Sequence, residues 1–431
     1  MSTISNVIKI NDRKTINGWA IYDWANSAYF LVISTAIFPA YFLSNTPEVV
    51  SVMGLEMTNS SLYSYSVSFS YLVIVFLSPL LSGIADFGNK RMYFLKLFTI
   101  VGSLACIALY FFAGVGQMWL GTSAFILATI GCAGGIVFYN AYLPEIVTED
   151  RVDSVSAKGY SYGYIGSVLL LIMILVLAMK PDWFGITSET LPYRIGFVMV
   201  GLWWIGFAQI TFRRLPGSGI GRITLEMMNK GVMEIKAVAR KLREQPNILR
   251  YLASFFFYSA GVQTVIYLAS AFGAKELGFT TINLITVILI LQFLAMVGAY
   301  LFAQVSKRVG NKWALIIMNI IWISICLVAF FVENHIQFYV IAGFVGLVMG
   351  GIQSLSRSTY SKMVEENRED LTSYFSFYDI VYKLSVVIGT FVFGLIEHLT
   401  SNMRFSILGL AIFFIIGISI LTTVKVKFKS A

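Results

Sequence analysis

Charged residues are scarce in this chain of 431 residues. They make up only 12% of the sequence, while hydrophobic residues make up 58%. A soluble domain is about 25% charged, so this composition excludes a water-soluble globular protein. The mean hydropathy of +0.78 is typical of a chain that lies mostly in a membrane.

Cysteine and histidine are also rare. The three cysteines, Cys106, Cys132 and Cys326, lie far apart and inside apolar stretches. This pattern indicates neither a disulfide framework nor a metal site. The only two histidines, His335 and His398, fall in different predicted loops. We therefore predict that the protein holds no metal.

Several catalytic patterns are missing. The chain has no G-x-x-x-x-G-K-[ST], which excludes a pump with a P-loop. It has no G-x-S-x-G and no H-E-x-x-H, which argues against a serine hydrolase and a zinc protease. We predict that the protein is not an enzyme and uses no cofactor.

Long apolar runs dominate what is present. Twelve runs are long enough to cross a bilayer, which takes roughly 20 residues. They lie near 18–43, 62–84, 94–114, 119–143, 160–179, 193–212, 251–273, 282–303, 313–332, 336–356, 373–396 and 403–424. The fold class predicted is an all-α membrane protein with twelve transmembrane helices.

Positive charge lies on one side of these runs. If residue 1 is cytosolic, only Lys180, Arg194, Lys275 and Arg404 of the 31 Lys and Arg residues fall outside the inner loops and inner helix ends. This is the positive-inside bias. We predict that both termini are cytosolic. The net charge of +9 then faces anionic membrane lipid rather than nucleic acid.

One polar segment divides the chain into six runs plus six. Residues 213–250 follow the sixth run and carry apolar residues at helical spacing with basic residues between them. We interpret this segment as an amphipathic helix on the inner membrane surface, with a regulatory docking site as the alternative. The predicted domains are a six-helix bundle at 1–212, this linker at 213–250, and a second six-helix bundle at 251–431.

The two halves carry related triplets. Gly88-Asn89-Lys90 after the second run recurs as Gly310-Asn311-Lys312 after the eighth. Gly134-Gly135-Ile136 in the fourth run recurs as Gly350-Gly351-Ile352 in the tenth. Internal duplication of a six-span unit is a signature of secondary transporters.

Three runs also contain glycines four residues apart. The pairs are Gly131 with Gly135, Gly159 with Gly163, and Gly346 with Gly350. Such spacing lets helices approach closely.

The segment Gly83-Ile84-Ala85-Asp86-Phe87-Gly88-Asn89-Lys90-Arg91 resembles the loop 2–3 signature of the major facilitator superfamily. The resemblance makes Asp86, Lys90 and Arg91 candidates for gating. In the second half Arg308 stands where Asp86 would be, so that copy lacks the acid.

A more specific match lies in the first run. Trp19-Ala20-Ile21-Tyr22-Asp23-Trp24-Ala25-Asn26-Ser27-Ala28-Tyr29 resembles the opening motif of the vacuolar effluxer-like branch of that superfamily, which includes the autophagy-related amino-acid exporter of the fungal vacuole and many bacterial members. Leu143-Pro144-Glu145-Ile146 fits the same branch. The resemblance implies two pseudo-symmetric six-helix bundles and export of a small solute. In the seventh run Ala260 precedes Gly261, where many relatives carry an acid.

Ionisable residues inside membrane spans are functional candidates by default, because an unpaired charge there costs several kcal/mol. Asp23 in the first run and Asp379 and Lys383 in the eleventh meet this criterion. Asp379 and Lys383 are four residues apart, with the acid on the N-terminal side, the better orientation for an ion pair. Two readings stay open. In one, the pair is structural; in the other, Lys383 binds a substrate carboxylate or an aspartate takes up a proton.

Further candidates are uncharged or lie at the ends of the runs. Gln263, Asn140, Tyr139, Trp24 and Tyr258 are candidates for lining a solute cavity. Glu145 and Arg357, at inner ends and expected to be more exposed, are candidates for a cytosolic gate, with interfacial anchoring as the alternative.

The sequence thus predicts a secondary transporter that works by alternating access as a monomer in a bacterial cytoplasmic membrane. Its partners would be a small-molecule substrate such as an amino acid or related metabolite, together with protons and membrane lipid. The alternatives are a membrane scaffold or sensor that does not transport, and a channel or scramblase.

Overall fold

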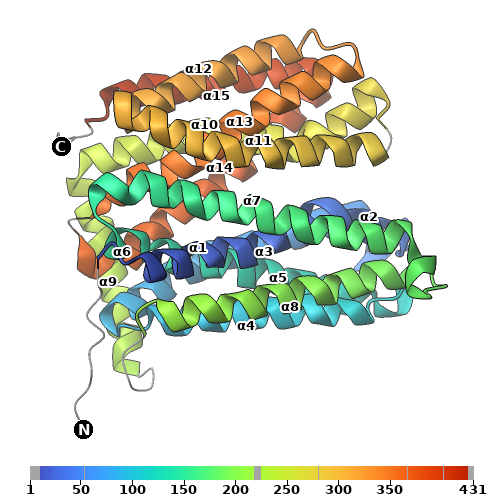
Figure 1. Cartoon of the computed structure of the whole chain (residues 1–431), viewed down its shortest axis with the longest axis horizontal. Helices are drawn as coiled ribbons and strands as arrows, with labels where there is room; N and C mark the ends of the chain where they lie inside the picture. The colour runs from blue at the N-terminus through green and yellow to red at the C-terminus, as the bar shows by residue number, and fades with distance from the viewer. Residues whose placement is uncertain are drawn as a thin grey trace. The chain divides into compact units, whose positions relative to one another are not determined.

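A computed structural model describes residues 10–52, 54–217, 225–279, 281–365, 367–400 and 402–425 (Figure 1). Eleven helices among these residues are long and apolar enough to cross a membrane, and each overlaps a predicted run. The remaining run, 251–273, lies within helix α10 (Pro246–Leu277). The structure therefore confirms an all-α membrane protein.

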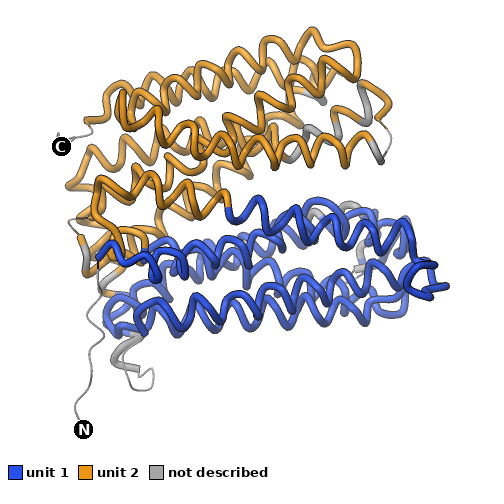
Figure 2. The backbone as a smooth tube through the Cα atoms, in the orientation of Figure 1, with its two compact units in different colours: residues 1–142, 162–232 blue, residues 143–161, 233–431 orange. Residues whose placement is uncertain are grey.

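The chain forms two compact units, each assembled from segments that are not continuous in sequence (Figure 2). Unit 1 contains residues 1–142 and 162–232, and unit 2 contains residues 143–161 and 233–431. Two helices therefore have residues in both units: α7 (Glu149–Met179) and α9 (Leu225–Glu244). The domain boundaries expected from the sequence stay a prediction.

Unit 1 contains the first four spans, the sixth span and a small hairpin. Besides its parts of α7 and α9 it holds α1 (Arg13–Ala28), a π-helix (Tyr29–Ile37), α2 (Phe38–Ser44), β1 (Val49–Val52), β2 (Leu55–Thr58), α3 (Asn59–Phe87), α4 (Arg91–Ala108), α5 (Met118–Asn140), α8 (Leu191–Arg214) and 3₁₀ turns at Leu109–Phe111, Val115–Gln117 and Pro181–Phe184. The strands pair antiparallel, Val49 with Thr58 and Val52 with Leu55. Gly54 takes a positive φ of 83° in the connecting turn, a conformation that favours glycine.

Unit 2 contains the last six helices of the chain. Besides its parts of α7 and α9 it holds α6 (Leu143–Ile146), α10, α11 (Thr281–Val309), α12 (Asn311–Ala329), α13 (His335–Val364), a 3₁₀ turn (Arg368–Asp370), α14 (Leu371–Thr400) and α15 (Met403–Thr423). Side chains set several helix starts. Asn334 accepts the Gln337 N–H at the start of α13, and Asn402 accepts the Arg404 N–H at the start of α15. Both are ordinary N-caps.

The first span is not a uniform α-helix. Its middle, Tyr29–Ile37, is π-helical and leads into Pro39 near the start of α2. Proline lacks an N–H, and its ring clashes with the carbonyl four residues earlier, here that of Thr35. A wider turn avoids this clash. The carbonyl of Ser34, five residues before Pro39, accepts a hydrogen bond from the Tyr63 hydroxyl at 3.1 Å.

The predicted linker helix is present as α9, but its apolar face does not lie entirely on lipid. Val238 and Leu242, which belong to unit 2, are buried. A Cβ on Gly83 of α3 would lie 2.2 Å from the Gly231 carbonyl oxygen, so α9 also touches α3 within unit 1. The placement of this helix on the inner membrane surface stays a prediction.

Glycines bring α11 and α13 into direct backbone contact. A Cβ on Gly350 would lie 1.9 Å from the Ala295 carbonyl oxygen, and one on Gly298 would lie 1.8 Å from that of Leu347. A Cβ on Gly346 would likewise lie 2.6 Å from the Leu291 carbonyl oxygen. The close approach predicted from Gly346 and Gly350 is confirmed.

Candidate functional site

Asp379 and Lys383 form an ion pair on one face of α14. Only 7% of Asp379 and 3% of Lys383 is exposed. Removing two charges from water carries a penalty that their mutual attraction must offset. The sequence predicted this pairing from spacing alone, and the structure places the two charged groups in direct contact.

Unit 2 also contains stacked aromatic rings. The ring of Tyr378, the residue before Asp379, stacks on Phe255 of α10 with centroids 4.3 Å apart. It also stacks on Tyr360 of α13 at 4.9 Å. Stacked rings of this kind bury a large apolar area and fix one another's orientation. Unit 2 therefore holds a buried pair of opposite charges and, around the residue that precedes Asp379, an aromatic cluster.

The hydroxyl of Tyr258 already forms a hydrogen bond within the protein. It lies 2.7 Å from the Ser356 hydroxyl, and Tyr251 donates to the Ser356 carbonyl oxygen at 2.8 Å. Tyr258 is almost fully buried. Its ring packs edge-on against Phe255, so it supports the aromatic cluster. Gln263 is buried further along α10.

In unit 1, Asp23 and Tyr139 are brought together from the first and fourth spans. The Tyr139 hydroxyl donates to Asp23 Oδ2 at 2.8 Å. Trp19 stacks on the Tyr139 ring at 4.6 Å and donates its indole N–H to the Tyr139 carbonyl oxygen at 3.1 Å. The partly buried carboxylate of Asp23 is thus held by the Tyr139 hydroxyl, and Trp19 of the first-span motif positions the Tyr139 ring.

Trp24 follows Asp23 in the sequence, and Asn140 follows Tyr139. The Trp24 ring stacks on Trp203 of α8 at 5.6 Å and packs against Gly166 of α7. These contacts join the first span to α7 and α8 within unit 1. Asn140 is buried at the end of α5. Their role as cavity-lining residues stays a prediction.

Two residues of the loop 2–3 motif contact each other in unit 1. Arg91 Nη2 lies 3.3 Å from Asp86 Oδ1, and the Asp86 side chain is 1% exposed. The Arg91 guanidinium also lies 5.2 Å from the centroid of the Tyr142 ring. Lys90 is buried beside them. Arg91 therefore holds the acid of the motif in place.

Glu145 and Arg357 differ in exposure. Glu145 lies half-buried on the short helix α6. Arg357 is only 3% exposed, so the expectation of a more exposed position is wrong for it. The cause is its partner in the same unit: Arg357 donates to Ser156 of α7, to the hydroxyl at 3.0 Å and to the carbonyl oxygen at 2.8 Å.

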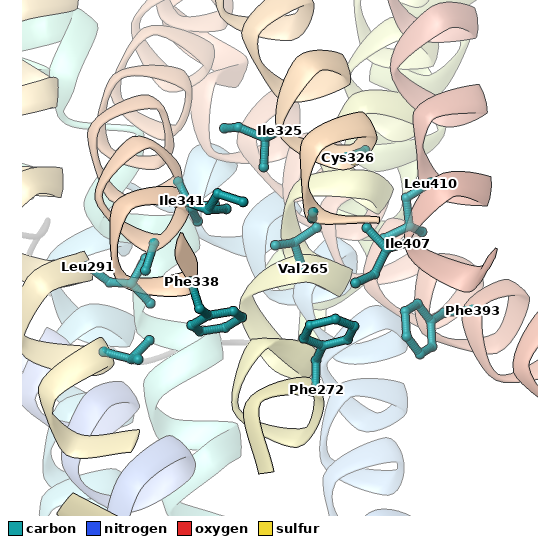
Figure 3. A pocket seen from close by; sticks show the side chains of 14 residues that line it. Val265, Phe272, Leu291, Ile325, Cys326, Phe338, Ile341, Phe393, Ile407 and Leu410 are labelled. Atoms are coloured by element: carbon teal, nitrogen blue, oxygen red, sulfur yellow. The ribbon is translucent and has the colours of Figure 1, made fainter. Parts of the chain in front are cut away.

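An apolar pocket lies elsewhere in unit 2, with a cavity volume of about 50 Å³ (Figure 3). Phe272 of α10, Phe338 of α13 and Phe393 of α14 lie around it, together with Cys326 of α12. No charged residue lines it. A cavity this apolar stays dry, so it does not serve as the site for a charged solute.

Sequence reasoning missed the buried acid Asp153. It was assigned to an inner loop because the fifth apolar run was placed at 160–179, whereas α7 begins at Glu149. Its carboxylate contacts Lys362, Asn311 and Ser306. The Gly310-Asn311-Lys312 triplet had been noticed, but only as a repeat.

Solved structures show which fold this arrangement belongs to. The chain superposes on the fucose transporter FucP in its outward conformation with a TM-score of 0.71, 12% identity, and coverage of 96% of this chain and 100% of that one. It superposes on the proton:xylose symporter XylE with a TM-score of 0.74, 14% identity, and coverage of 96% and 95%. The chain has the fold of major facilitator superfamily transporters.

Relatives in sequence show to which family of transporters with this fold the chain belongs. The chain is 28% identical over 419 residues to the uncharacterized MFS-type transporter YxiO of Bacillus subtilis (strain 168), covering 95% of both chains. It is 24% identical over 428 residues to autophagy-related protein 22 of Saccharomyces cerevisiae, covering 86% of this chain and 79% of that one. Residues 11–430 match the family described as vacuole effluxer Atg22 like, and the chain belongs to that family. It is a multi-pass membrane protein of a secondary transporter class.

Proposed function

We propose that this protein exports a small zwitterionic solute, of the amino-acid class, across a bacterial cytoplasmic membrane. It works as a monomer by alternating access, with both termini in the cytosol. The observation that carries the proposal is the buried ion pair of Asp379 and Lys383 beside the stacked ring of Tyr378.

The chemistry of the pair fits a zwitterion. A solute that brings one carboxylate and one ammonium group can exchange partners with the pair. Its carboxylate then takes the place of Asp379 at Lys383, and its ammonium takes the place of Lys383 at Asp379. Each charge keeps a partner throughout, which avoids the cost of an unpaired charge inside a membrane.

The direction of transport and its coupling to protons rest on separate arguments. The family's description as effluxers supports export. Proton coupling would act through Asp379, when the substrate separates it from Lys383, and through Asp23, which has a hydroxyl donor in Tyr139. Buried carboxylates are the groups that carry protons in many transporters.

Transport by purified protein in proteoliposomes tests the proposal. We expect saturable movement of at least one amino acid, which a protonophore reduces. A thermal-shift screen against amino acids and related metabolites should find the same ligand, because a ligand that binds only the folded state raises its apparent stability. Lys307→Met, an exposed lysine on α11, is the matched control for variants of Lys383.

The rival functions predict other results. A scaffold or sensor shows no saturable flux of any amino acid. A channel or scramblase shows flux that does not saturate and does not respond to the proton gradient. Either result would contradict the proposed transport function.

A further inference from the structure

The apolar cavity of unit 2 lies inside the helix bundle and apart from the candidate site. All six helices from α10 to α15 contribute described residues to its wall, among them Phe272, Leu291, Cys326, Phe338, Phe393 and Leu410 (Figure 3). Neither Asp379 nor Lys383 is among the described residues that line it. The cavity is therefore a feature of the bundle that the proposed function does not use.

The internal repeat places a stacked ring in unit 1 where unit 2 has an aliphatic side chain. Phe125 stands nine positions before Gly134 of the repeated triplet, and Ile341 stands nine positions before Gly350 of its second copy. The Phe125 ring stacks on Phe38 of α2 with centroids 4.7 Å apart, and both rings are buried. Ile341 instead lines the cavity. The second half thus lacks the ring that fills this position in the first.

Two pairs of aromatic rings join α12 to α15. Trp322 stacks on Phe414 with centroids 5.5 Å apart, and Phe330 packs edge-on against Phe405 at 5.4 Å. Between the first pair and the second, residue numbers rise along α12 and fall along α15, so the two helices are antiparallel. The seam between them therefore has a ring pair on either side of its middle part.

This middle part of the seam borders the cavity. Cys326 and Ala329 of α12 lie there together with Ile407 of α15, and all three line the cavity. Ala329 and Ile407 are also partly exposed, and Val328, next to Ala329, is 54% exposed. Exposed apolar side chains of a membrane span face lipid chains, which are as apolar as they are. The wall of the cavity therefore reaches the lipid-facing surface between α12 and α15.

The size and chemistry of the cavity select its ligand. An engineered apolar cavity of about 150 Å³ stays dry and binds benzene or xenon. The cavity of unit 2, at about 50 Å³, suits a molecule of a few heavy atoms. The ring pairs on either side of its entry leave no room for the length of a lipid chain.

We propose that this cavity is a binding site for a small uncharged apolar molecule, of the light hydrocarbon class, that enters from the bilayer between α12 and α15. The ligand makes dispersion contacts with the wall that a void would forfeit. Because all six helices line the cavity, a ligand there favours their present packing and stabilises unit 2. The site is distinct from that of the transported solute, and the inference does not depend on the proposed function.

Xenon is the probe, because it is apolar, uncharged and small. Thermal unfolding of the purified protein in detergent is measured under xenon and under nitrogen at equal pressure. We expect a higher midpoint under xenon, since a ligand that binds only the folded state raises apparent stability. Ala342→Leu enlarges a residue that lines the cavity and should abolish the rise. Val340→Leu, at an exposed position of the same helix, is the matched control and should retain it.

Two results of this comparison would overturn the site. One is the absence of any rise in the parent protein, and the other is an equal rise in the Ala342→Leu and Val340→Leu proteins. If Ala342→Leu does not fold, Cys326→Leu fills the cavity from α12, with Val328→Leu as its exposed control. Crystals kept under xenon should show its anomalous signal between Cys326 and Phe338, and a signal elsewhere alone would contradict the assignment.

A photoreactive lipid distinguishes a free molecule from a lipid chain. The protein is placed in phosphatidylcholine vesicles in which a fraction of the lipid carries a diazirine on one chain, and labelled residues are located by mass spectrometry after illumination. We expect label on exposed residues such as Val328 and none on Cys326 or Phe338. Label on Cys326 that Ala342→Leu removes would assign the cavity to a lipid chain and overturn the choice of a free molecule.

Discussion

At the scale of single residues, Lys383 is the group whose loss should harm transport most. Lys383→Met leaves Asp379 buried without its partner, and breaking a buried pair in this way costs about 3–5 kcal/mol of stability. Asp379→Asn should cost a similar amount. The double variant removes both charges, so its thermal stability should return close to that of the parent.

Transport separates the two readings of this pair. If Lys383 binds the solute, the double variant folds but does not transport in proteoliposomes. If the pair is only structural, the double variant regains transport along with stability. A folded Lys383→Met protein with unchanged transport and pH dependence would remove the functional reading.

Asp86 should affect conformational balance more than substrate affinity. Its side chain is buried against Arg91 at 3.3 Å, and the second copy of the motif has no equivalent acid. Asp86→Asn should favour inward-open states, because the motif loses the charge that its basic residues hold in place. Cysteine cross-linking across the cytosolic face measures the shift. Asp182→Asn, an exposed acid in a predicted outer loop, should leave the cross-linking unchanged, and an unchanged pattern in Asp86→Asn would refute the gating role.

At the scale of elements, glycine decides how closely α11 and α13 pack. Gly350→Ala places a methyl group 1.9 Å from the Ala295 carbonyl oxygen, so the helices must separate. Overpacking of this kind costs about 1–3 kcal/mol. Gly206→Ala on α8 is the control because nothing lies within 4 Å of its added methyl group. In a helix that change should be neutral or stabilise by about 0.5–1 kcal/mol. Thermal unfolding in detergent compares the two, and equal midpoints would contradict the packing argument.

The elements also show what the sequence could predict. Hydropathy located the spans because each must be apolar over its whole length. It placed the start of the fifth run near residue 160, yet α7 begins at Glu149, because the polar turns around Asp153 are buried by protein rather than by lipid. Hydropathy does not distinguish a polar helix end that packs on protein from a loop in water. Hydropathy likewise does not distinguish the π-helix at Tyr29–Ile37 from an α-helix.

The candidate site was predictable only where its contacts are local. The pairing of Asp379 with Lys383 follows from a spacing of four residues on one helix. The hydrogen bond from Tyr139 to Asp23 joins residues of different spans, and no pattern in a single sequence specifies such a partner. The role of Tyr258 in lining a solute cavity stays a prediction, and its contact with Ser356 depends on how α10 packs on α13.

At the scale of the whole molecule, the distribution of basic residues predicts the orientation in the membrane. Both termini and residues 213–250 should lie in the cytosol, because the opposite orientation would move nearly all Lys and Arg residues to the outer side. Residues 1–9, 218–224 and 426–431 lie outside the described part of the chain, including Ser218, a natural position for a reporter. Glu244, the exposed last residue of α9, can take its place.

Labelling of single cysteines in intact cells tests this orientation. All three natural cysteines are buried and are removed first. Ser188→Cys, in the predicted outer loop after α7, should react with a membrane-impermeant maleimide added from outside, because the side chain is exposed. Glu244→Cys is equally exposed but should react only after the membrane is permeabilised. Labelling of Glu244→Cys in intact cells, with Ser188→Cys protected, would invert the topology. The candidates for a cytosolic gate, among them Asp86 and Arg91, would then face outward, and the direction of export would have to be argued anew.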